Sequence, residues 1–214
     1  MIPAKVKQNA VHRLIVEGKD DLYSIIELTT KHGWDWNNPQ PHYPYIDDAK
    51  GDTLALEALP VTLRSCRRVG IVLDADIAVG DRWQSLCDRL TGSGFPLPDQ
   101  PYPAGTVAAA ADGRRLGVWL MPDNQNPVKL EDFLALLVPP DDPCWGWSEE
   151  STAHAHQLGA GFAQTDFIKA RIHTWLAWQE EPALPFGTAI RAATFAHDAD
   201  AARRFVAWME RLFV

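Results

Sequence analysis

The sequence contains few cysteines and no long hydrophobic run, and these absences narrow the class of protein. Its three cysteines, Cys66, Cys87 and Cys144, lack metal-ligand spacing, and an odd number cannot all pair within one chain. Unpaired thiols are typical of a reducing compartment, so we expect a cytoplasmic protein. No apolar run approaches the roughly 20 residues that span a bilayer. Residues 1–10 also lack the apolar core of a signal peptide, so we expect no membrane association.

Basic residues are also scarce. The 214 residues include 20 Lys and Arg against 28 Asp and Glu, which gives a net charge of −8. Tight nucleic-acid binding by one chain alone depends on basic surface, so this charge argues against it, although a bound metal would offset part of the deficit. Several arginines concentrate in one part of the chain, where solvated surface is their ordinary role. These arginines are Arg64, Arg67, Arg68, Arg82 and Arg89.

One apolar segment leads directly into a pair of carboxylates. Residues 69–73 (VGIVL) precede Asp74 and Asp76. A short apolar run of this kind predicts a strand buried on both faces of a sheet, and residues i and i+2 of an extended chain point the same way. We therefore expect Asp74 and Asp76 to project together from the carboxyl end of a central strand, where open α/β sheets bind their ligands. Two adjacent carboxylates repel unless a cation lies between them, and hard oxygen ligands suit Mg²⁺ or Mn²⁺.

A second segment has the same design. Residues 11–16 (VHRLIV) lead into Glu17, and a helix-like segment containing Asp21 follows. Gly18 permits a tight turn between the strand and the helix. Two parallel strands that each deliver carboxylates to one edge of a sheet would form a metal site with three or four oxygen ligands.

The remaining pattern predicts an α/β core at residues 1–140. We expect a mostly parallel central sheet flanked by helices. The expected strands are 11–16, 43–48, 69–74, 106–110 and 115–121, with Asp112-Gly113 as the turn of a hairpin between the last two. The expected helices are 19–32, 53–66 with an interruption or kink near Pro60, 81–90 and 130–137.

The last third of the chain differs, because only helical patterns occur there. We expect helices at about 144–157, 166–180 and 199–212. We therefore divide the chain into the core at 1–140 and a helical extension, residues 141–214, that packs on it.

The two acidic motifs resemble those of the TOPRIM domain, the metal-binding α/β domain of topoisomerases, bacterial primases and the overcoming-lysogenization-defect (OLD) nucleases. They are VEGKDD at residues 16–21 and LDAD at residues 73–76. Over residues 8–212 the chain resembles a small, uncharacterised family of stand-alone TOPRIM-like proteins. The further segments that carry this likeness are GVWLMPDN at 117–124, LEDF at 130–133 and IHTWLAWQE at 172–180.

The resemblance implies a TOPRIM-like, Rossmann-like fold with Mg²⁺ or Mn²⁺ as the cofactor. It implies catalytic roles for Glu17, Asp74 and Asp76. OLD-type relatives bind a second metal through an acidic pair near the position of Glu131 and Asp132. The expected metal ligands are thus Glu17, Asp21, Asp74, Asp76 and Glu131.

The resemblance also suggests an activity, a Mg²⁺-dependent nuclease acting on nucleic acid. OLD nucleases couple this domain to an ATPase. No Gly-x-x-x-x-Gly-Lys-Ser/Thr motif occurs here, so a separately encoded ATPase is the expected partner. The zinc-ribbon cysteines of some TOPRIM enzymes are absent. Lys19, Arg82 and Lys129 are candidates to bind the phosphate of the substrate.

Each of these residues also has an ordinary structural role. Acidic residues after strands often cap helices, which suits Asp20 and Asp81 better than Asp74 or Asp76 because the last two precede the turn. Glu131 and Asp132 would favourably occupy a helix N-terminus. Lys19 and Lys129 suit solvated surface.

Two other functions remain open. One is a TOPRIM-like module that binds a metal or a partner without turnover. The other is a haloacid-dehalogenase-like phosphatase, which also uses Asp-x-Asp after a strand. That motif requires Thr or Val where Ala78 stands, and it lies near the amino terminus of those enzymes.

Overall fold

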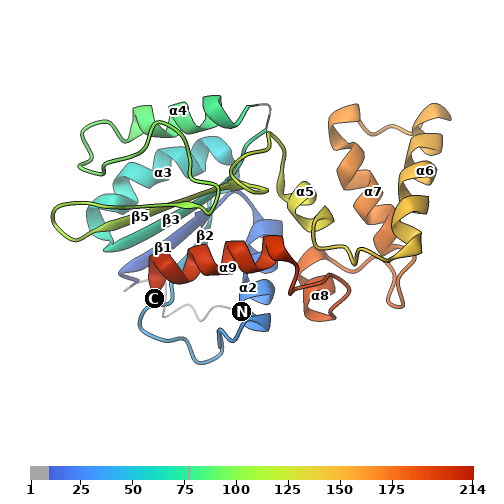
Figure 1. Ribbon diagram of the computed structural model, residues 1–214, viewed down its shortest axis with the longest axis horizontal. Coiled ribbons are helices and arrows are strands. Elements are labelled where there is room, and N and C mark those ends of the chain that lie inside the picture. The colour runs from blue at the N-terminus through green and yellow to red at the C-terminus, as the bar shows by residue number, and fades with distance from the viewer. Residues whose placement is uncertain (1–9, 77) are drawn as a thin grey trace.

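The apolar runs of the sequence form the centre of one five-stranded sheet. We describe a computed structural model that covers residues 10–76 and 78–214, so residues 1–9 of the expected core and Ile77 lie outside it (Figure 1). The strand order is β2-β1-β3-β5-β4, and β4 alone runs antiparallel to its neighbour. The mostly parallel α/β sheet predicted from the sequence is confirmed. The strands are β1 (His12–Val16), β2 (Tyr45–Asp48), β3 (Arg68–Asp74), β4 (Thr106–Ala109) and β5 (Arg115–Met121).

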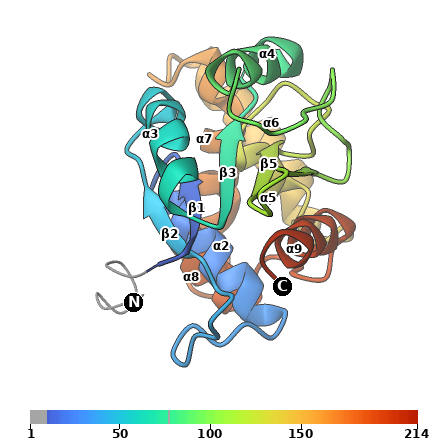
Figure 2. The same ribbon diagram turned by 90° about the vertical axis from the view of Figure 1, so that its left-hand side faces the viewer.

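Helices cover both faces of the sheet, as Figures 1 and 2 show. On one face lie α3 (Asp52–Ser65) and α4 (Val79–Arg89), and on the other lie α2 (Lys19–Lys31) and α9 (Asp200–Phe213). Successive side chains of a strand point to opposite faces, so each central strand supplies both cores. For example, Ile71 packs with the α3 and α4 core and Val72 with the α2 and α9 core. This explains why the central strands read as continuous apolar runs.

The remaining helices follow the sheet in the chain. They are α5 (Leu130–Ala135), α6 (Pro143–Gln157), η1 (Gln164–Asp166), α7 (Phe167–Leu176) and α8 (Phe186–Arg191). Helices α6 and α7 stand beyond α5, away from the sheet (Figure 1). The Arg171 guanidinium joins them, because it donates to the Trp145 carbonyl at 3.0 Å and lies 3.6 Å from the centroid of its ring. No helix in the described part of the chain combines the length and apolar character needed to cross a bilayer.

Two glycines let α9 pack closely on the sheet. A Cβ atom on Gly117 would lie 2.3 Å from Cδ2 of Leu212, and one on Gly70 would lie 2.6 Å from Cδ1 of Leu14. Side chains from the first strand and from the last helix therefore share one hydrophobic core. Through α9, the extension thus forms part of the helical layer that covers the sheet. It is not limited to the α6 and α7 pair that stands away from the sheet.

The helices differ from the expected ones in three places. Helix α3 continues through Pro60 without interruption, because Leu56, Leu59 and Leu63 anchor both sides of the proline in the core. Helix α7 ends at Leu176 and not near residue 180. Helix α8 was missed, because its six residues are too few for a periodic pattern and its burial against α2 is a tertiary contact.

Candidate functional site

The parallel pairing of β1 and β3 brings two of the predicted acidic residues together. Glu17 follows the last residue of β1, and Asp74 is the last residue of β3. The Asp74 backbone N–H donates to Oε1 of Glu17 at 2.7 Å. Burial is the largest cause that raises the pKa of Glu17, and this hydrogen bond opposes it. The carboxyl edge of the sheet therefore holds both groups in one partly desolvated place.

Asp21 joins them from the first turn of α2. Its Oδ2 accepts from the Gly18 N–H at 3.0 Å, which caps the start of the helix. Only 8% of Asp21 is exposed. Burial, followed by repulsion from Glu17, raises its pKa to about 7. Asp21 thus has a structural role as a cap and also adds a carboxyl group to the edge.

Asp74 lies at the centre of this group. Its Oδ1 accepts from the Leu130 N–H at 2.9 Å, so it also holds the start of α5. Burial and then the carboxylates of Glu17, Asp21 and Glu131 raise the pKa of Asp74 to about 8. We call these four residues, Glu17, Asp21, Asp74 and Glu131, the carboxylate cluster. At neutral pH a cation would be needed to keep all four ionised.

Glu131 has a cationic partner from the extension. It lies in the first turn of α5, with 7% of its surface exposed, and its Oε1 is 3.0 Å from Nζ of Lys169 on α7. Asp132, the next residue, accepts from the Lys129 N–H at 3.1 Å. The structure therefore separates the acidic pair, because Glu131 reaches the cluster while Asp132 caps α5.

The expectation that Asp76 projects beside Asp74 assumes an extended chain, and Asp76 does not have that conformation. It lies beyond the end of β3 with φ 54°, in the left-handed region, so the alternation of an extended strand no longer applies. Its carboxylate is paired with Arg82, which also donates to Oδ2 of Asp52 at 2.9 Å. A non-glycine residue in this conformation is strained, and such strain occurs often at functional sites.

The carboxylates are not assembled as a ready ion site. Among residues 10–76 and 78–214, no group of three or more His, Cys, Asp or Glu side chains could hold a metal ion as arranged here. The donors nevertheless suit Mg²⁺ or Mn²⁺, since they are carboxylate oxygens and Asp74 lies partly buried beside other acids. Asp76 and Glu131 are instead paired with Arg82 and Lys169.

A cleft of about 640 Å³ opens beside Asp76. Lys129 lines it from the core, and Phe167 and Ile168 line it from the extension. Lys129 is therefore placed where a substrate phosphate could reach it. Lys19 is exposed on the first turn of α2, and Arg82 already binds two carboxylates.

No sequence motif pointed to Lys169 and Asp52, which pair with the predicted site residues Glu131 and Arg82. Both reach their partners over long separations in the chain. No local spacing could have found them.

Comparison with known proteins assigns the chain to a family. It belongs to the family described as protein of unknown function DUF3226, whose model matches residues 11–214. No curated protein and no solved structure matches the chain.

Proposed function

We propose that the carboxylate cluster and Asp76 bind Mg²⁺ or Mn²⁺ and that the site hydrolyses phosphodiester bonds in nucleic acid, as the TOPRIM domains of OLD-type nucleases do. One observation carries the proposal: Asp74 lies partly buried at the carboxyl edge of the sheet, with three other carboxylates close enough to raise its pKa. A fold that places like charges together in a desolvated place gains from a cation there. The TOPRIM resemblance of residues 16–21 and 73–76 supports the same conclusion.

The residues of the site have separate roles in this proposal. Glu17, Asp21 and Asp74 hold the ion from β1, α2 and β3, and Asp76 and Glu131 complete its ligands. When bound, the ion polarises a phosphate oxygen and lowers the pKa of a water molecule.

In an alternative to its role as a ligand, Glu17 would accept a proton from that water, since burial raises its pKa above the ordinary value. Lys129, in the cleft, is suited to neutralise and orient the substrate phosphate. Lys19 and Arg82 are further candidates for this role, Arg82 only after it releases a carboxylate.

The negative net charge of the chain favours a partner protein that binds the nucleic acid. With a net charge of −8, the protein has little electrostatic attraction for nucleic acid of its own. A separately encoded ATPase or another nucleic-acid-binding chain would supply it.

A specific observation favours a second function, a module that binds a metal or a partner without turnover. Asp76 and Glu131 are paired with Arg82 and Lys169, so those two carboxylates are neutralised without an ion. In this alternative the carboxyl edge is a structural charge network.

Calorimetric titration with Mg²⁺ and Mn²⁺ tests the proposal. The wild type is compared with Asp74→Asn/Asp76→Asn and with Asp81→Asn, a control that removes an exposed carboxylate on α4. We expect saturable binding by the wild type and the control, and an affinity at least about 10-fold lower in the double variant. Cleavage of single-stranded, duplex and supercoiled DNA is then assayed with and without chelator.

The outcomes separate the two functions. Metal-dependent cleavage that Asp74→Asn abolishes while the fold persists supports the nuclease. Metal binding without cleavage of any of these substrates supports the non-catalytic module. The absence of saturable binding in the wild type would overturn the metal site itself.

A further inference from the structure

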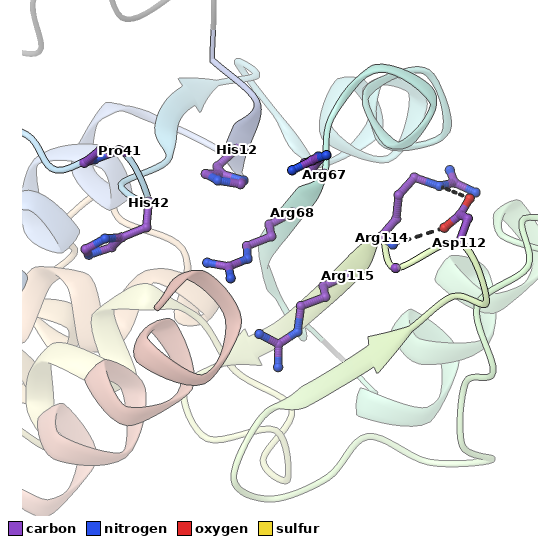
Figure 3. A pocket seen from close by; sticks show the side chains of 9 residues that line it. His12, Pro41, His42, Arg67, Arg68, Asp112, Arg114 and Arg115 are labelled. Carbon is purple, nitrogen blue, oxygen red and sulfur yellow. Dashed lines mark hydrogen bonds and ion pairs between the residues drawn. The ribbon is translucent and has the colours of Figure 1, made fainter.

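Basic residues gather at the opposite edge of the same sheet. His12 at the start of β1 pairs in register with Arg68 at the start of β3, and Arg68 pairs with Arg115 at the start of β5. Residues in register on adjacent parallel strands point to the same face and lie roughly 5 Å apart. We call these three residues the basic row. Their side chains extend into one space, which Figure 3 shows.

The row lines a hollow of about 620 Å³. Pro41 and His42 border it on one side, and the turn that joins β4 to β5 borders it on the other (Figure 3). Arg67 and Arg114 also line it. Asp112 is the only carboxylate side chain among the described lining residues. It is bound to Arg114, with Oδ2 2.6 Å from Nε.

Structural partners account for only part of this charge. Arg68 donates to the Phe213 carbonyl at the end of α9, and Arg114 donates to the Leu63 carbonyl at 2.7 Å as well as to Asp112. Within the described chain, Arg67 and Arg115 have neither a hydrogen-bond acceptor nor an ion-pair partner for their side chains. Nδ1 of His12 is buried without a hydrogen bond.

The groups repel one another. Burial and then the charges of Arg68 and Arg67 lower the pKa of His12. Burial and then Arg115 lower the pKa of Arg68. Like charges placed side by side on adjacent strands destabilise a sheet. The chain has a net charge of −8, so its many acidic residues could have supplied ion-pair partners for these basic groups. The edge is therefore arranged for an anion that comes from outside the chain.

We propose that this hollow is a binding site for a small, multiply charged phosphate compound, such as the di- or triphosphate group of a nucleotide. Guanidinium groups bind phosphate oxygens through paired hydrogen bonds, and Arg67, Arg68 and Arg115 offer several at once. The basic groups converge on one hollow and do not form a stripe across the surface. A compact anion fits that arrangement better than an extended nucleic-acid backbone.

This site is separate from the carboxylate cluster. Arg68 and Asp74 occupy the two ends of β3, six residues or about 20 Å apart. A single phosphate group cannot contact both, so the basic hollow does not hold the bond that the proposed nuclease would cleave. Occupancy of the hollow would instead make the protein responsive to a phosphate compound.

Calorimetry with sodium tripolyphosphate and pyrophosphate, in a chelating buffer without phosphate, tests the proposal. We expect saturable binding by the wild type and a loss of affinity of about 10-fold or more for each arginine removed in Arg67→Gln/Arg115→Gln. Neither arginine has an acceptor within the described chain, so we expect the double variant to fold. An unchanged or higher melting temperature checks this.

Arg204→Gln is the control for each single arginine removed, because it takes one positive charge from an exposed residue early in α9. It should retain wild-type affinity. Absence of binding by the wild type, or an equal loss in the control, would overturn the proposal. Binding of a 12-nucleotide strand without binding of either small phosphate would also overturn it, in favour of a nucleic-acid contact.

The result is independent of the proposed nuclease. Asp74→Asn/Asp76→Asn should bind tripolyphosphate as the wild type does, since both positions lie at the other edge. Failure of the metal titration therefore leaves the anion site standing, and failure of the anion titration leaves the metal site standing.

Discussion

At the scale of single residues, burial governs the chemistry of Asp74. Its carboxyl group lies at the end of a strand that is buried on both faces, and it is used to anchor α5 through the Leu130 N–H. The same burial, together with neighbouring acids, shifts its pKa to about 8. Asp74 therefore anchors the start of α5, and the protonation of the same carboxyl group depends on pH and on nearby cations.

This shift predicts how the stability of the metal-free protein depends on pH. Asp74 and Asp21 have folded-state pKa values of about 8 and about 7, above the ordinary 3.8 of the unfolded chain. Between these limits the folded state holds protons that the unfolded state has released. The free energy of unfolding should fall as pH rises from 4 to 8, by at most about 1.4 kcal/mol per pH unit for each group.

Thermal melts in chelating buffer measure this dependence. The melting temperature of the wild type should decrease from pH 5 to pH 8. Asp74→Asn should melt higher than the wild type at pH 8 with a flatter pH profile, because its amide keeps an acceptor for Leu130. Asp81→Asn should follow the wild type. A wild-type melting temperature that stays constant over this range would contradict the prediction.

At the scale of elements, the close packing of α9 on the sheet depends on a glycine, which has no Cβ atom. Gly117 leaves the space that Leu212 and Trp208 fill. The sequence pattern predicted a helix at about 199–212 but could not show which strands it would meet.

Gly117→Ala should therefore destabilise the protein by about 1–3 kcal/mol, because the new Cβ would lie 2.3 Å from Leu212 and the helix would have to shift. Gly80→Ala is the control, since no atom lies within 4 Å of its Cβ position in α4, and it should be neutral or stabilising by up to about 1 kcal/mol. Urea denaturation measures both. Equal stability of the two variants would mean that α9 does not pack on Gly117 as described.

At the scale of the whole molecule, the extension reaches into the site of the core. Lys169 on α7 neutralises Glu131, and α7 also lines the cleft beside Asp76. If the proposed metal site is correct, the position of α7 therefore affects how readily the carboxylate cluster accepts a cation.

Lys169→Met removes the competing charge and keeps a long apolar stem. If the proposed metal site is correct, the rise in melting temperature caused by saturating Mg²⁺ should be larger in this variant than in the wild type. Without metal, the variant should lose about 1–3 kcal/mol, because Glu131 stays buried without its partner. Lys169→Arg, which keeps the charge, should resemble the wild type. An unchanged or smaller response to Mg²⁺ would contradict the coupling.

Local pattern was enough for much of the fold and for part of the site. Apolar runs that end in acids predicted β1 and β3, and parallel pairing then placed Glu17 and Asp74 at one edge. The hairpin at residues 112–113 and most helices followed from turn residues and helical periodicity. These features depend on neighbours in the chain, so their signals are present in short windows of sequence.

Contacts between distant residues decided the rest. The left-handed turn at Asp76 and its pairing with Arg82 depend on packing after the strand ends, which the pattern of the strand does not indicate. The contact between Glu131 and Lys169 and the basic row at the other edge arise only when separate elements meet in register. No spacing within the chain encodes those meetings, because the free energy that selects them comes from burying the faces of the sheet and helices against one another.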